Sequence, residues 1–180
     1  GAENRHLRGV GEDLHLVRRA GETDGSGMSV LAVIPARGGS KGIPHKNLKE
    51  IVGKPLVVWM IEAAIAAPSV DTVYVSSDDP GIRHLAYDYC NAVERPPHLS
   101  GDMISSEQAV LHTLERYASL GPGGAEYPDT LLMLQPTSPL TLPEDIEGVL
   151  AALDAPAGTH TPLQFDSCLL YTSPSPRDRQ

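Results

Sequence analysis

The sequence predicts an α/β fold with a mostly parallel sheet, because three short apolar runs alternate with helical patterns. The runs span residues 30–34, 72–75 and 130–134. Nearly continuous apolar runs of this length are typical of parallel strands that helices cover on both faces. The segments between them carry apolar residues at spacings of three and four, which indicates helices packed on the sheet.

Several of the expected helices have a recognisable start. Pro55 stands where a first helical turn tolerates proline, and the segment after it has an apolar face. Asp79 and Pro80 form a pair typical of an N-cap and a first turn. The expected helices are residues 56–67, 80–90 and 105–120, and a fourth that begins at Leu142 and Pro143.

The composition divides the chain into three parts. Residues 1–27 are rich in glycine and charge without a sustained apolar period, so we expect a flexible, non-native leader before a start at Met28. Residues 28–167 hold the α/β domain, which we interpret as incomplete. Residues 168–180 carry two Ser-Pro steps and a charged end, so we expect a disordered, artefactual tail after the natural reading frame is lost.

The charge and the cysteine content exclude several classes of protein. The net charge of −9 over 180 residues argues against binding a nucleic acid polymer, which requires a surplus of cations. Cys90 and Cys168 form no CxxC pair, and the seven histidines show no ligand spacing. No apolar stretch approaches the roughly 20 residues needed to cross a bilayer. We therefore expect a soluble cytoplasmic protein with no membrane partner.

The densest chemical signal directly follows the first expected strand. Ligands of parallel α/β sheets bind beyond the carboxyl ends of the strands, and glycines let backbone N–H groups approach phosphate oxygens. Gly42 after Lys41 excludes the GxxxxGK[ST] motif, and the adjacent Gly38 and Gly39 exclude GxGxxG. A triphosphate site is predicted, and a solvated surface loop is the alternative. The glycines and cations of this loop are Arg37, Gly38, Gly39, Lys41, Gly42 and Lys46.

Residues 36–47 resemble the signature ARxxSKGxPxKN of the acylneuraminate cytidylyltransferases, or CMP-N-acetylneuraminic acid synthetases. The resemblance extends to VSSD at 75–78, to RPPHLSGD at 95–102 with two serines after it, and to LQPTSPL at 134–140. It covers roughly residues 28–153 and implies a Rossmann-like three-layer nucleotidyltransferase fold. Thr141 stands where the family usually has Arg, which places one contact in doubt.

The resemblance also implies roles for individual residues. Arg37, Lys41 and Lys46 would be catalytic, with Arg37 and Lys46 on the β- and γ-phosphates of CTP and Lys41 shaping the loop. Gln135 would face the acceptor sugar, and the backbone near Ala36 would read the base. The nucleotide-binding set would be Ala36, Arg37, Gly38, Gly39, Lys46, Asn47, Arg95 and Ser106.

Some of these residues also have a purely structural alternative. Arg95 could be a solvated surface residue, Ser106 a residue of a helical first turn, and Asn47 or Gln135 a turn residue. Asp78 and Asp79 are candidate metal ligands by residue type, but Asp79 before Pro80 is better explained as a helix cap, and Asp78 is left without a role.

The implied reaction transfers CMP from CTP to an acidic nine-carbon sugar, a nonulosonic acid of the sialic type, with release of pyrophosphate. Lys41 favours this branch over relatives that activate 3-deoxy-manno-octulosonate, which usually have Arg there. The family implies Mg²⁺ and a homodimer. Because a late Asp-x-Asp pair for Mg²⁺ has no counterpart before Gln180, we expect no metal ligands in this chain and weak turnover. The alternatives are an inactive CTP-binding fragment and a nucleotidyltransferase for another sugar.

Overall fold

The computed structural model describes residues 29–39, 42–101, 104–120, 127–153 and 168–172. In these ranges strands and helices alternate along the chain, and the strands belong to two sheets. The strands are β1 (Val30–Pro35), β2 (Glu50–Ile51), β3 (Lys54–Pro55), β4 (Thr72–Ser77), β5 (Asn91–Glu94), β6 (Thr130–Leu134) and β7 (Cys168–Thr172). The helices are α1 (Leu56–Ala66), α2 (Pro80–Tyr87), α3 (Ser106–Leu120) and α4 (Pro143–Leu153), with 3₁₀ turns η1 (Lys46–Leu48) and η2 (Pro97–Leu99).

The main sheet has the strand order β5-β4-β1-β6-β7. Strands β5, β4, β1 and β6 run parallel, and β7 adds to β6 in the antiparallel direction. The mostly parallel sheet that the apolar runs predict is therefore confirmed.

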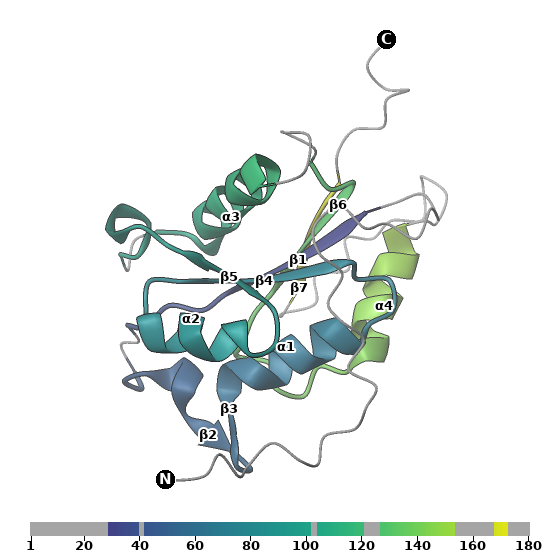
Figure 1. The fold of residues 1–180 in the computed structure, drawn as a ribbon. Coiled ribbons are helices and arrows are strands. Elements are labelled where there is room, and N and C mark those ends of the chain that lie inside the picture. The colour runs from purple at the N-terminus through teal and green to yellow at the C-terminus, as the bar shows by residue number, and fades with distance from the viewer. Residues whose placement is uncertain (1–28, 40–41, 102–103, 121–126, 154–167, 173–180) are drawn as a thin grey trace, which may run out of the picture.

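Helices cover both faces of the sheet, which makes three layers (Figure 1). Helix α3 lies on one face, and α1, α2 and α4 lie on the other. Alternate residues of β1 serve the two sides: Leu31 and Val33 pack with Val110 of α3, whereas Ala32 and Ile34 belong to the core under the other helices. Because both sides of β1 are buried, its sequence is a continuous apolar run.

The three strands and four helices expected from the sequence are all present. Helix α2 begins as predicted, because Oδ1 of Asp79 accepts hydrogen bonds from the backbone N–H groups of Gly81 at 2.7 Å and Ile82 at 3.2 Å. It ends at Tyr87, a little before the expected end at Cys90. Among the described helices, none is long and apolar enough to cross a membrane.

Several short elements carry too little pattern to be predicted. Strand β5 is four residues long and only partly buried. Strands β2 and β3 form a two-stranded hairpin whose turn, Val52-Gly53, has positive φ at both residues. Gly adopts this conformation readily, whereas Val is strained in it.

The tail expected to be disordered differs from the structure at residues 168–172. These residues form β7, which pairs with β6 from Leu134↔Cys168 to Thr130↔Thr172. The physical reason is the free edge of β6, where backbone groups need partners that another extended segment supplies. The leader, residues 1–27, and residues 173–180 lie outside the described residues, so the domain boundaries remain predictions.

Candidate functional site

A cavity of about 290 Å³ lies at the carboxyl ends of β1, β5 and β6. The chain passes from β1 to β4 on one side of β1 and returns to β6 on its other side. Crevices form at such switch points of parallel sheets, and ligands bind there. The residues that line the cavity are Pro35, Arg37, Lys46, Asn47, Arg95, Gly101, Ile104, Ser105, Ser106, Gln135, Pro136 and Thr137.

The cavity brings together six of the residues singled out in the sequence. They come from the ends of β1, β5 and β6, from η1 and from the start of α3. Gly38 and Gly39 instead line a neighbouring open hollow, Ala36 is buried, and Lys41 lies outside the described residues. The six are Arg37, Lys46, Asn47, Arg95, Ser106 and Gln135.

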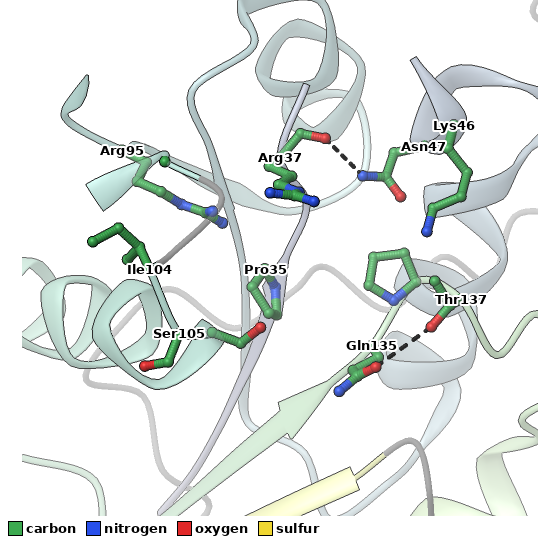
Figure 2. Close-up of a pocket in the computed structure, with 12 residues that line it drawn as sticks. Pro35, Arg37, Lys46, Asn47, Arg95, Ile104, Ser105, Gln135 and Thr137 are labelled. Atoms are coloured by element: carbon green, nitrogen blue, oxygen red, sulfur yellow. Dashed lines mark hydrogen bonds between the residues drawn. The ribbon is translucent and has the colours of Figure 1, made fainter. Parts of the chain in front are cut away.

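Three cations point into the same space from three parts of the chain. Figure 2 shows the guanidinium groups of Arg95 and Arg37 and the amino group of Lys46 around the cavity, with Ser105 and Gln135 across from them. In a chain of net charge −9, this grouping creates a local positive field. The cavity therefore suits an anionic ligand.

Arg95 is buried, with 7% of its surface exposed. Its Nη2 donates to the carbonyl oxygen of Ser76 at 2.6 Å and its Nε to the Ser76 hydroxyl at 3.3 Å, so the side chain is fixed against the end of β4. Burial lowers the pKa of the Arg95 guanidinium, the Asp78 carboxylate raises it, and the charge of Arg37 lowers it further. An anion in the cavity would relieve the cost of burial and repulsion. The reading of Arg95 as a solvated surface residue is wrong.

Asn47 joins η1 to the segment that follows β1, and so holds together the loop from Arg37 to Lys46. It is buried, and its Nδ2 donates to the carbonyl oxygen of Arg37 at 2.9 Å. This bond ties η1 to the residue that follows β1 by two positions, which keeps Lys46 near Arg37. Asn47 therefore has a structural task beside any contact it makes with a ligand.

Gly38 is needed for close packing. Its N–H donates to Oδ1 of Asp78 at 2.9 Å, so this donor is already used inside the protein. A Cβ at this position would lie 2.7 Å from Cβ of Asp79. Among the described atoms, none lies within 4 Å of a Cβ built at Gly39 or Gly42, and neither has a positive φ. Against the described part of the chain, Gly38 is the loop glycine at which a side chain would clash.

The backbone of Ala36 is likewise engaged in the sheet. Its N–H donates to the carbonyl oxygen of Ser76 at 2.9 Å, and its side chain is fully buried. The N–H of Ala36 is therefore already used, and the predicted contact with a base would be made by its carbonyl group.

The polar side of the cavity is formed by the end of β6 and the start of α3. The Thr137 hydroxyl donates to Oε1 of Gln135 at 3.4 Å, which leaves the carboxamide nitrogen on the other side of the group (Figure 2). Ser106 lines the cavity and is also the first residue of α3, so its place in the first helical turn is confirmed and its contact with a nucleotide stays a prediction. Sequence reasoning did not single out Ser105 or Thr137, although both lie inside or beside the quoted motifs.

The described residues offer no obvious metal centre. No group of three or more His, Cys, Asp or Glu side chains in the described ranges could hold an ion. Asp79 is occupied as the cap of α2, and its Oδ2 lies 3.4 Å from Nδ1 of His45.

Burial raises the pKa of the Cys90 thiol to about 12, so this cysteine is a poor nucleophile at neutral pH.

Two curated relatives are similar to this chain over about two thirds of its length. The chain is 38% identical over 122 residues to N-acylneuraminate cytidylyltransferase of Oncorhynchus mykiss, covering 67% of the chain and 26% of that protein. It is 38% identical over 119 residues to CMP-N,N'-diacetyllegionaminic acid synthase of Legionella pneumophila, covering 66% of the chain and 50% of that protein. The chain thus spans a quarter to a half of these relatives.

The fold is also similar to that of a solved structure with a related sequence. It is similar to CMP:2-keto-3-deoxy-manno-octonic acid synthetase complexed with CTP, at a TM-score of 0.60 and 28% identity, over 72% of this chain and 49% of that one. The expected three-layer nucleotidyltransferase fold is therefore confirmed. A family model described as cytidylyltransferase matches residues 31–164. The chain belongs to the cytidylyltransferase family.

Proposed function

We propose that this chain carries the CTP site of an enzyme that transfers CMP to a nonulosonic acid and releases pyrophosphate. The observation that supports this most directly is the convergence of Arg37, Lys46 and Arg95 on one cavity at the carboxyl edge of the sheet. Three cations from separate segments match the charge of a triphosphate, and one of them is buried, so it would gain from an anionic partner.

In the proposed reaction the anomeric hydroxyl of the sugar attacks the α-phosphorus of CTP. A new bond forms between that oxygen and the α-phosphorus, and the hydroxyl proton is released to solvent. The bond from the α-phosphorus to the oxygen that bridges to the β-phosphorus breaks, and pyrophosphate leaves. Arg37 and Lys46 are assigned to the β- and γ-phosphates, where their charges stabilise the negative charge that develops on the leaving group. Positioning of the two substrates supplies much of the remaining rate enhancement.

The acceptor is assigned to the side of the cavity that Gln135 occupies. Its carboxamide, held by Thr137, offers a donor to a sugar oxygen or carboxylate. Two relatives at 38% identity are named for sialic-type and legionaminic acids, which favours a nine-carbon acid. The name of the structural neighbour at 28% identity keeps 3-deoxy-manno-octulosonate as the second candidate.

Mg²⁺, a homodimer and a cytoplasmic location complete the proposal for the whole protein. Mg²⁺ would neutralise phosphate charge when bound. No step above is assigned to it, because the described residues hold no group suited to a metal ion.

Calorimetry with CTP tests the nucleotide site. Arg37→Ala and Lys46→Ala should each weaken CTP binding by about ten- to a hundredfold, the loss expected for a charge-assisted hydrogen bond. Lys49→Ala is the matched control, because Lys49 is an exposed lysine in the same segment that does not line the cavity. Unchanged affinity in both cavity variants would instead support a solvated loop.

Pyrophosphate release tests the acceptor. The protein should release pyrophosphate with CTP and N-acetylneuraminic acid in preference to GTP or to 3-deoxy-manno-octulosonate. CTP binding without release with any acid would favour the inactive, nucleotide-binding alternative.

A further inference from the structure

Two aspartates at opposite ends of β4 make the same kind of contact with β1. Asp71 precedes β4, and its Oδ2 accepts the backbone N–H of Val30 at 2.8 Å. Asp78 follows β4, and its Oδ1 accepts the backbone N–H of Gly38 at 2.9 Å. Both side chains are half-buried. The two carboxylates can therefore be compared directly. Asp78 lies at the carboxyl ends of the strands, beside the cavity, and Asp71 lies at their amino ends.

Asp78 stands where its charge should be unfavourable for the proposed ligand. Its carboxylate acts on the charge of Arg95, and so does the guanidinium of Arg37, which places both groups within electrostatic reach of Arg95. A carboxylate next to a triphosphate site repels the phosphates. The same carboxylate favours the charged form of Arg95, and its Oδ1 also accepts the Gly38 N–H.

That bond fixes the backbone directly after Arg37. Gly38 is held on one side by Asp78 and packs on the other side against Asp79, whose Cβ leaves no room for a side chain. Asp79 is itself fixed, because its N–H donates to the Ser77 hydroxyl at 3.1 Å and its carboxylate caps α2. Gly38 is thus held between Asp78 and Asp79, and these contacts restrain the backbone next to Arg37.

We propose that Asp78 is a positioning residue, which accepts the Gly38 N–H and thereby holds Arg37 in the orientation that a CTP phosphate requires. The inference rests on the proposed function. It assigns the hydrogen-bond acceptor, rather than the negative charge, as the property of Asp78 that matters.

The test compares Asp78→Ala, Asp78→Asn and the control Asp71→Ala by calorimetry with CTP. Asp78→Ala should weaken CTP binding by about tenfold, which corresponds to about 1.4 kcal/mol. Asp78→Asn keeps an acceptor oxygen and removes the repelling charge, so it should bind CTP at least as tightly as the parent. Asp71→Ala should bind CTP like the parent, because its contact lies at the other end of the sheet.

Simple charge repulsion predicts the opposite sign, since removal of a carboxylate would then tighten binding in both Asp78 variants. Equal or tighter CTP binding by Asp78→Ala would overturn the inference, as would an Asp78→Asn variant as weak as Asp78→Ala or an equal loss in Asp71→Ala. If Asp78→Ala does not fold, Asp78→Asn decides alone, and weaker binding in it contradicts the inference.

Hydrogen exchange of the Gly38 amide, followed by NMR, separates this inference from the proposed function. The amide should exchange faster in Asp78→Ala and stay protected in Asp78→Asn. A parent protein that does not bind CTP would refute the proposed function. In that case the exchange result still decides whether Asp78 orders the loop, and unchanged protection in Asp78→Ala overturns it.

Discussion

The two ends of the parallel sheet are built with similar contacts but are surrounded by different charges. At the amino end, Asp71 accepts the N–H of Val30, and Asp129 accepts the N–H and the hydroxyl of Ser29 at 2.8 and 3.0 Å. These contacts join the starts of β1, β4 and β6. They satisfy backbone donors where the ladder begins, which is a structural task.

At the carboxyl end the same kind of contact lies beside cations and a cavity. Asp78 accepts the N–H of Gly38, and Arg37, Lys46 and Arg95 surround the space next to it. Carboxylate-to-amide contacts are therefore present at both ends of the sheet and by themselves do not distinguish the two. The gathering of positive charge, some of it buried, is what distinguishes the functional end.

The largest effect is expected from Arg95→Met at the carboxyl end. Loss of the charged contact should weaken CTP binding by about ten- to a hundredfold, or about 1.5–3 kcal/mol. The free energy of unfolding should fall by about 1–3 kcal/mol, because the buried Ser76 hydroxyl loses its hydrogen-bond donor. Calorimetry and urea denaturation of the same samples check both parts. A less stable variant with unchanged CTP affinity would show that Arg95 belongs only to the scaffold.

The next effect concerns the clamp around Gly38. Gly38→Ala places a methyl group 2.7 Å from Cβ and Oδ2 of Asp79, which should lower the free energy of unfolding by about 1–3 kcal/mol. Gly39→Ala is the control, since no described atom lies within 4 Å of the added methyl, and it should change stability by less than about 0.5 kcal/mol. Equal effects of the two substitutions in urea denaturation would contradict the packing described here.

The smallest effect is expected at the amino end. Asp129→Ala removes exposed hydrogen bonds to Ser29, which should cost about 1 kcal/mol or less of unfolding free energy. CTP affinity should not change. A clear loss of CTP binding in this variant, measured under the same conditions as Arg95→Met, would remove the distinction between the two ends.

Strong local patterns made much of the fold predictable from the sequence. Strands β1, β4 and β6 are buried on both faces, so each contains a short run of apolar residues that alternation does not interrupt. The N-cap Asp79 was recognisable because a cap and the proline after it are adjacent in the chain. Strand β5 was missed since its four residues are only partly buried, and β7 was missed because its pairing depends on the open edge of β6.

Part of the membership of the candidate site was predictable, but its internal contacts were not. Shared motif spacing drew attention to Arg37, Lys46, Arg95 and Gln135, which do line one cavity. The bond between Asp78 and Gly38 joins residues 40 positions apart, and no local pattern reports it. The loop glycines were interpreted as phosphate donors, whereas the N–H of Gly38 is already bonded within the protein.

A CTP titration followed by NMR tests the central claim most directly. Amides at the carboxyl end of the sheet, among them Gly38, Asn47 and Gln135, should shift as CTP is added, and cytidine without phosphates should shift them far less. Amides at the amino end, such as Ser29 and Asp129, should not move. Shifts centred on the amino end, or equal responses to CTP and cytidine, would contradict a phosphate site built from Arg37, Lys46 and Arg95.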